Sequence, residues 1–231
     1  MTDPAAARPL ALVTGASRGL GWSLALEAAA RGFHVLALAR TVGALEELDD
    51  AIKAAGGAAT LAPLDLKDEE GVERLAGAIA GRWGALDLWL HCAAPAPPLA
   101  PVAYAEPKEL DKALAAVGQT QRLVTALDPL VRAAGRSRVV WMDDLRDGDP
   151  YFGAYAAMKA ATRALWSAWA AETRKAAAPR VIRALPPPMA TALRARFYPG
   201  EDRSRHADRA VVARRLMDAL ERDADPIDLR D

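Results

Sequence analysis

A tyrosine and a lysine, Tyr155 and Lys159, stand four positions apart in an alanine-rich segment. On a helix this spacing brings the two side chains to one face, so the phenol hydroxyl and the ammonium group converge. A nearby cation stabilises the phenolate and lowers the pKa of a tyrosine from its ordinary value of about ten. The pair therefore predicts a group at Tyr155 that donates a proton to a carbonyl or accepts one from an alcohol.

A glycine-rich stretch at residues 13–21 is the second signal of chemistry. The apolar run at 10–13 leads into it, and the apolar-rich segment at 22–30 leaves it and stops before Gly32, which predicts a strand, a tight turn and a helix. Glycines permit positive φ, and they let a phosphate approach the backbone because no side chain stands in the way. The N-terminus of the helix would direct its free N–H groups at that phosphate. The stretch predicts a dinucleotide pyrophosphate site.

The next apolar segment, residues 33–40, predicts a buried strand whose end meets the adenosine ribose in a dinucleotide-binding fold. A protein that binds NAD places a carboxylate there, whereas this chain has Ala39 followed by Arg40. An arginine binds a 2′-phosphate in a bidentate manner, and Arg18 in the glycine-rich stretch is a second cation in reach. We therefore expect NADP rather than NAD; the alternative is two solvated arginines in an arginine-rich chain.

Strands and helices alternate through the rest of the chain. Further strands are predicted at residues 58–64, 86–90, 138–142 and 180–185. Segments with helical spacing separate them at residues 41–55, 67–82, 109–134 and 155–175. This order predicts a parallel sheet with right-handed crossovers. We expect an α/β fold, a Rossmann-type doubly wound parallel sheet in a single domain over residues 1–231, with about six strands, helices on both faces and a seventh strand that is short or absent.

The overall composition excludes several classes of protein. The 231 residues carry no net formal charge and a single cysteine, Cys92. Balanced charge argues against a binder of nucleic acid or of anionic membranes, and one cysteine rules out an intrachain disulfide and fits a reducing cytoplasm. No apolar run is long enough to span a bilayer, and the start lacks the order of a signal peptide. We expect a cytoplasmic protein that binds neither nucleic acid nor membrane.

Two sets of side chains resemble metal ligands. His91 and Cys92 are adjacent, but the three histidines are not spaced for zinc, so a packed pair at a strand end is the plainer interpretation. The aspartates between 143 and 149 fit no calcium-loop spacing and predict a solvated loop. We expect no metal site.

The spacing Thr-Gly-x-x-x-Gly-x-Gly and the Tyr-x-x-x-Lys pair after the fifth predicted strand resemble the short-chain dehydrogenase/reductase family. The resemblance runs from about residue 10 to about residue 191. It implies an oxidoreductase that transfers a hydride between NADPH and a small carbonyl or alcohol substrate, with Tyr155 as the acid/base and Lys159 assisting. The positions that it assigns to NADP(H) binding are Gly15, Ser17, Arg18, Gly19, Leu20, Gly21, Arg40, Asp65, Leu66, Ala93, Lys159, Met189 and Thr191.

Within that set, the resemblance gives some residues particular contacts. Asp65, followed by Leu66, would hydrogen-bond the adenine amino group, and it could also serve as the N-cap of the helix at 67–82. Lys159 would bond the ribose hydroxyls of the nicotinamide half. The backbone of Met189 would meet the carboxamide.

The chain departs from the family pattern in the half of the site that would hold nicotinamide. Ala94 and Pro187 replace glycines, and Ala115 stands in the slot of an asparagine. Asp144 is the best match to the family's catalytic serine, which donates a hydrogen bond to the substrate oxygen. An ionised Asp144 only accepts and would repel a developing alkoxide, whereas a protonated one in an apolar pocket could donate. Asp144 therefore remains a candidate catalytic residue, either ionised or protonated.

Two functions follow from this pattern. Tyr155 and Lys159 favour an NADP-dependent enzyme. Asp144, Ala115 and Pro187 favour a degenerate relative that binds NADP(H) as a sensor, scaffold or partner subunit. The resemblance also implies a homodimer that packs through the helix of Tyr155. Residues 191–207 are expected to form a lid over the substrate, and their arginines would either meet an anionic substrate or stay solvated.

Overall fold

A parallel sheet of seven strands, in the order β3-β2-β1-β4-β5-β6-β7, forms the centre of the molecule. The computed structural model describes residues 8–174 and 179–230. The strands are β1 (Leu10–Thr14), β2 (His34–Ala39), β3 (Ala58–Pro63), β4 (Leu88–His91), β5 (Arg138–Met142), β6 (Arg180–Leu185) and β7 (Ile227–Asp228). The chain starts at β1, moves outward to β3 and then returns to β4 beside β1, so the direction of winding reverses between β1 and β4. A ligand crevice is expected at such a reversal, outside the carboxyl ends of the strands.

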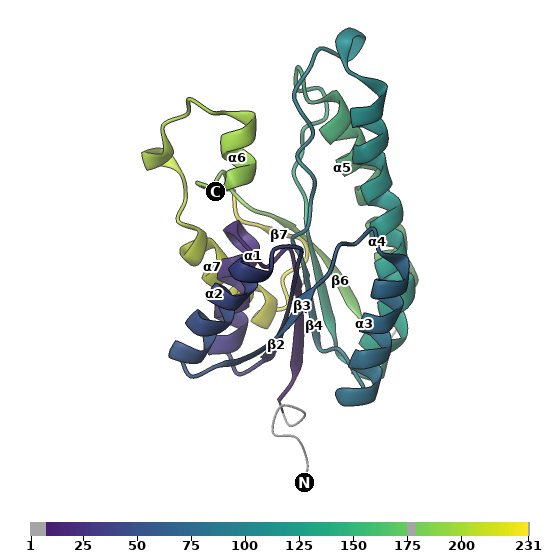
Figure 1. Ribbon diagram of the computed structural model, residues 1–231, viewed down its shortest axis with the longest axis vertical. Coiled ribbons are helices and arrows are strands. Elements are labelled where there is room, and N and C mark those ends of the chain that lie inside the picture. Colours follow the sequence, from purple (N-terminus) through teal and green to yellow (C-terminus); the bar gives the residue numbers. More distant parts are fainter. Residues whose placement is uncertain (1–7, 175–178, 231) are drawn as a thin grey trace.

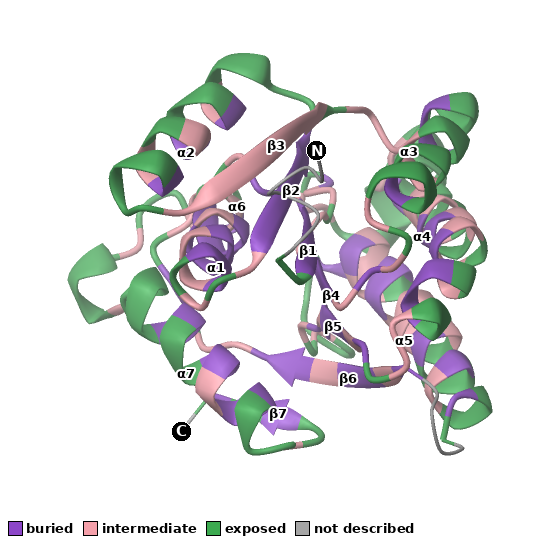
Figure 2. Ribbon diagram, turned by 90° about the horizontal axis from the view of Figure 1, so that it is seen from below, coloured by how far each residue is buried: buried purple, intermediate pink, exposed green. Residues whose placement is uncertain are grey.

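Helices cover both faces of this sheet (Figures 1 and 2). They are α1 (Gly19–Ala30), α2 (Val42–Ala54), α3 (Glu69–Arg82), α4 (Pro107–Ala133), α5 (Gly153–Glu172), α6 (Ala192–Phe197) and α7 (Arg209–Glu221), with 3₁₀ turns η1 (Val102–Tyr104) and η2 (Arg203–Arg205). One layer holds α1, α2 and α7, and the opposite layer holds α3, α4 and α5 (Figure 2). The prediction of a Rossmann-type doubly wound sheet is confirmed.

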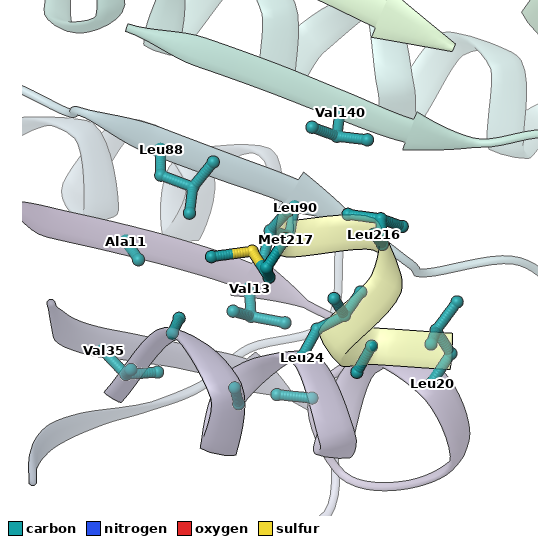
Figure 3. Packing of buried hydrophobic residues seen from close by; sticks show 14 of the residues in the cluster. Ala11, Val13, Leu20, Leu24, Val35, Leu88, Leu90, Val140, Leu216 and Met217 are labelled. Atoms are coloured by element: carbon teal, nitrogen blue, oxygen red, sulfur yellow. The ribbon is translucent and has the colours of Figure 1, made fainter. Parts of the chain in front are cut away.

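The central strands are apolar throughout because both of their faces are covered. All five residues of β1 are buried, and successive side chains point to opposite sides. Val13 packs in one cluster with Leu24 of α1 and Leu216 of α7 (Figure 3). Leu12 packs in the other, with Trp89 of β4. Burial on both faces therefore fixes the register of the strands that carry the site.

The seventh strand exists, and it is only two residues long. It pairs with the end of β6, with Ala184 opposite Ile227 and Leu185 opposite Asp228. Ile227 is buried in the cluster around α1 and α7, and this burial anchors the short strand. The expected count of about six strands is corrected to seven.

The helix predicted from residue 67 begins later, at Glu69. Its N-cap is Asp68, whose side chain accepts a hydrogen bond from the N–H of Gly71 at 2.9 Å. Asp65 instead accepts from the N–H of Lys67 at 3.1 Å, so it closes the turn before the helix and is not its cap. Two glutamates in the first turn favour a start at this point because they lie at the positive end of the helix dipole. Asp65 is thereby left at the rim of the sheet.

No helix within residues 8–174 and 179–230 has the length and apolar character that crossing a membrane requires.

Candidate active site

A cleft of about 1290 Å³ lies at the carboxyl ends of the strands. It begins beside the turn after β1, passes the ends of β4 and β5, and is bordered by α4 and by the segment of α6. Every residue that the sequence singled out for catalysis or coenzyme binding lines it, namely Gly15, Ser17, Arg18, Gly19, Leu20, Gly21, Arg40, Asp65, Leu66, Ala93, Asp144, Tyr155, Lys159, Met189 and Thr191. The fold therefore gathers residues from most of the chain's length around one space.

The glycine-rich turn is required by close backbone packing. Gly15 has a φ of 76°, and a Cβ on it would lie 2.9 Å from the backbone nitrogen of Ala93 after β4. A Cβ on Gly21 would lie 2.3 Å from the carbonyl oxygen of Gly15, which no real contact allows. These two glycines let the first turn of α1 rest directly on the turn and on the end of β4.

The start of α1 fits an anionic group. Arg18 is the N-cap residue, and its side chain makes no capping hydrogen bond. Gly19, with a φ of 60°, faces Thr191, whose Cγ2 lies 3.5 Å from the position of an added Cβ. The first N–H groups of a helix lack partners inside the helix, and side chains are absent here. A diphosphate can therefore reach the backbone between the turn and Thr191.

The adenosine end of the cleft carries a cluster of cations. Arg40 follows β2, its side chain is 71% exposed, and its Nη1 lies 3.9 Å from Oδ2 of Asp65. An exposed ion pair at this distance contributes little, so Arg40 is free to turn toward a phosphate. Sequence reasoning missed Thr41 and Lys67, which also line the cleft here. Thr41 is the N-cap of α2 and makes no side-chain cap bond, and its place next to Arg40 was the signal that could have found it.

The chemical end of the cleft brings Tyr155 and Asp144 together. The ring of Tyr155 is 1% exposed, and its hydroxyl donates a hydrogen bond to Oδ2 of Asp144 at 3.3 Å. Burial, and next the negative charge and hydrogen bond of Asp144, raise the pKa of Tyr155 above its ordinary value. The lowering of the Tyr155 pKa that the neighbouring lysine predicted is therefore wrong in this structure, because burial and Asp144 raise this pKa and the cation that opposes them is Arg146.

Lys159 lies on the same face of α5 but points past the phenol. Its Nζ donates to the carbonyl oxygen of Met142 at 2.8 Å, and it lies 5.8 Å from the centre of the Tyr155 ring. Burial lowers the pKa of Lys159, while the carboxylates of Asp143 and Asp144 oppose that effect. The ammonium group is thus fixed between the end of β5 and the cleft.

The aspartates after β5 do not form a uniformly solvated loop, so that expectation is wrong for Asp143. Its side chain has no exposed surface, and Oδ2 accepts from Nε of Arg163 at 2.8 Å. Oδ1 accepts from the backbone N–H of Asp144 at 2.9 Å. Arg163 also reaches Asp147 at 3.1 Å. Asp143 therefore ties the loop to α5 and sets the position of Asp144, which no sequence pattern indicated.

Arg146 is a further residue that sequence reasoning missed. Its Nε lies 3.0 Å from Oδ1 of Asp144, and its Nη1 lies 3.2 Å from Oδ2 of Asp149. The guanidinium carbon sits 5.2 Å from the centre of the Phe152 ring. Arg146 lines the cleft and holds one oxygen of Asp144, which leaves the other oxygen to Tyr155.

His91 and Cys92 are packed, neutral groups. Nδ1 of His91 lies 2.9 Å from Oγ1 of Thr14, and burial lowers the pKa of His91 to about 3. Burial raises the pKa of the Cys92 thiol to about 12. In the part of the chain that the structure describes, no three metal-ligating side chains gather in one place.

The segment 191–207 folds over the buried tyrosine. Thr191 caps α6 by accepting from the N–H of Arg194 at 3.2 Å. Phe197 of α6 packs against Tyr155, with their ring centres 4.9 Å apart. Glu201 accepts a hydrogen bond from Nε of Arg194 at 2.6 Å. This hydrogen bond is the main cause that lowers the pKa of Glu201 to about 2. Arg194 is therefore occupied within the segment, while Arg196 and Arg203 border the cleft.

Comparison with known proteins identifies the family. The family model of the short chain dehydrogenases matches residues 9–202. The chain belongs to the short-chain dehydrogenase/reductase family. A fatty acyl-CoA reductase of Acinetobacter baylyi is 47% identical over 66 residues, which make up 29% of this chain and 22% of that protein. The chain thus matches under a quarter of the length of this curated relative.

Solved structures match over nearly the whole chain. A putative short chain dehydrogenase of Escherichia coli CFT073, complexed with NADPH, is similar with a TM-score of 0.87 and 28% identity, over 96% of this chain and 97% of that one. A short chain dehydrogenase of Shigella flexneri 2a str. 301, complexed with NADP, is similar with a TM-score of 0.81 and 29% identity, over 87% and 86% of the two chains. These similarities confirm the family and the fold.

The structure corrects one position in the comparison with the short-chain dehydrogenase/reductase pattern. Ala115, the predicted asparagine slot, is exposed and does not line the cleft. Its neighbour Ala116 does, together with Gln119 and Thr120 on the same face of α4. A shift of one residue turns a side chain by about 100° around a helix, so Ala115 and Ala116 face different directions. The hydroxyl of Thr120 donates a hydrogen bond to the carbonyl oxygen of Ala116 at 2.9 Å.

Proposed function

We propose that this protein is an NADP(H)-dependent oxidoreductase that transfers a hydride to and from a small organic substrate, with a carbonyl or an alcohol as the substrate class that the family implies. The observation that carries the proposal is the presence of Tyr155 and Lys159 in the same cleft as the glycine-rich turn. The ring of Tyr155 packs against Phe197, but its hydroxyl and the ammonium group of Lys159 are polar groups at the lining of the cleft. Solved relatives that are complexed with NADP and NADPH support the choice of coenzyme.

The residues that line the cleft fit NADP(H). The diphosphate would lie on the turn at Gly15 and Gly19, where an added Cβ would meet backbone or the Thr191 side chain. Arg18 and Arg40 would hold the 2′-phosphate, and Asp65 would face the adenine. Bound there, the coenzyme would supply a hydride donor or acceptor at its nicotinamide ring.

Tyr155 and Lys159 would act at the nicotinamide end of the cleft. The high pKa of Tyr155 keeps the phenol protonated in the resting protein, so the group is a donor. Lys159, held by the carbonyl of Met142, would reach the ribose hydroxyls and supply positive charge beside the phenol. Phe197 covers the phenol and would keep water from it.

A specific observation favours a second function, NADP(H) binding without turnover. Asp144 draws the hydroxyl of Tyr155 away from a substrate, and Pro187 lines the cleft where the family has glycine. A sensor, scaffold or partner subunit would need the adenosine half of the site and could lose the rest. Titration with NADPH, followed by energy transfer from the six tryptophans to the nicotinamide, tests both functions, and turnover of a panel of carbonyl compounds separates them.

The choice of NADP over NAD makes a direct prediction for Arg40. Arg40→Ala should weaken NADPH binding about tenfold to thirtyfold, because a charge-assisted bond to the 2′-phosphate is lost. NADH binding should stay unchanged, since NADH lacks that phosphate. Arg136→Ala, at an exposed arginine that does not line the cleft, is the matched control. Equal losses for NADPH and NADH in Arg40→Ala would contradict the assignment.

We also propose a homodimer in the cytoplasm, following the family's use of the Tyr155 helix as an interface. The exposed outer face of α5 is available for such packing. Small-angle scattering should give twice the mass of one chain, and a monomeric mass would remove the proposal.

A further inference from the structure

The charges around the reacting end of the cleft differ from those that a carbonyl substrate needs. Residues 143–152 contain no serine or threonine, so no aliphatic hydroxyl follows β5. The hydroxyl of Tyr155 already donates to Oδ2 of Asp144 at 3.3 Å. A carbonyl oxygen entering here would compete with Asp144 for one proton donor.

Asp144 is paired with a permanent cation. Nε of Arg146 lies 3.0 Å from its Oδ1. Ring stacking on Phe152 and the bond to Asp149 fix Arg146 in place. Oδ2 of Asp144, the oxygen on the side of Tyr155, is left as the acceptor that lines the cleft.

An ionised carboxylate has opposite effects on two kinds of double bond. When hydride adds to a carbonyl carbon, negative charge grows on the oxygen, and Asp144 would repel it. When hydride adds to a protonated C=N bond, the nitrogen begins with positive charge and ends neutral. A carboxylate beside that nitrogen binds the cation, and an N–H of the substrate can donate to it.

We infer that the substrate is a protonated imine or an iminium ion, and that Asp144 is the residue that selects it. This inference rests on the proposed NADP(H)-dependent hydride transfer and names a C=N substrate in place of the carbonyl that the family implies. Hydride adds to the carbon, the π pair of the C=N bond becomes the lone pair of the nitrogen, and a neutral amine results; NADPH is the reductant and is oxidised to NADP⁺. No further proton is required, so Tyr155 can stay bonded to Asp144 and hold the carboxylate in position.

Binding of a fixed cation tests the inference without any turnover. N-methyl-3,4-dihydroisoquinolinium carries its C=N charge at every pH, and the ketone 1-tetralone is a neutral probe of similar size. Calorimetry on the coenzyme-free protein should show that Asp144→Asn weakens binding of the cation about tenfold and leaves the ketone unaffected. Asp50→Asn is the matched control, because it removes an equal charge from an exposed aspartate of α2 that does not line the cleft.

Reduction by NADPH gives the second readout. The wild-type protein should reduce the iminium ion, Asp144→Asn should lose about tenfold or more in kcat/KM, and Asp144→Ser should gain activity on the ketone. The inference is overturned if the wild type reduces the ketone and not the iminium ion, or if Asp144→Asn alters neither probe. Failure of NADPH to bind in the titration would instead overturn the proposed function, so the two failures are told apart.

Discussion

Tyr155→Phe will lower the turnover of a carbonyl substrate by about 10²–10⁴-fold, the range by which a positioned general acid accelerates a reaction. The substitution removes the only atom of this side chain that can transfer a proton. It also breaks the hydrogen bond to Asp144, while the buried ring keeps its packing against Phe152 and Phe197. Steady-state assays of NADPH oxidation measure the loss, and thermal unfolding checks that the fold is kept.

The same variant separates the two kinds of substrate. An iminium ion needs no proton from Tyr155, so its reduction should fall by much less than that of a ketone. NADPH binding should be unchanged, because Tyr155 lies at the opposite end of the cleft from Arg40. If Tyr155→Phe turns over every substrate at the wild-type rate, Tyr155 has no part in the chemistry. If the wild type and the variant are both inactive, the function without turnover gains support.

Gly21→Ala is expected to destroy the coenzyme site. The added methyl would sit 2.3 Å from the carbonyl oxygen of Gly15, and neither group is the end of a flexible side chain. The first turn of α1 must therefore move away from the glycine-rich turn, at a cost of roughly 1–3 kcal/mol in the free energy of unfolding. Because the N–H groups of that turn would hold the diphosphate, NADPH affinity should fall about a hundredfold or more, as two hydrogen bonds to a charged group are lost.

Gly77→Ala is the control for this substitution. Gly77 lies on the exposed face of α3, and an added Cβ there meets no atom within 4 Å. That variant should be more stable by about 0.5–1 kcal/mol, since alanine loses less conformational freedom in a helix, and NADPH affinity should not change. Denaturant unfolding and the NADPH titration measure both variants. Normal binding by Gly21→Ala would mean that the diphosphate does not rest on this turn.

The sequence was a good guide to the elements and to their order. Apolar runs such as residues 10–13 predict buried strands because a parallel sheet with both faces covered has no polar side. The glycine stretch predicts a strand, a turn and a helix because only glycine satisfies the backbone there, and the structure gives the reason at Gly15 and Gly21. The local signal was weaker at β7, which was expected to be short or absent; it is two residues long and is anchored by the burial of Ile227.

The electrostatic state of the site could not be predicted in this way. The spacing of Tyr155 and Lys159 correctly places both on one helix face, but the pKa of the phenol depends on burial and on Asp144, eleven residues earlier in the chain. Asp143 resembles its neighbour in sequence, yet it is buried against Arg163. Ala115 and Ala116 are chemically identical, and only the rotation of α4 decides which one borders the cleft.

By itself, the sequence determined the parallel fold, the glycine-rich turn and the residues that meet at the ends of the strands. Local residue types determine these features because they set the backbone conformation and the burial of each segment. Tertiary structure alone decided that Arg146 pairs with Asp144 and that the hydroxyl of Tyr155 donates to that side chain. The physical reason is that the electrostatic free energy of a charged group depends on every group packed around it. The fold, and not the order of residues in the chain, brings those groups together.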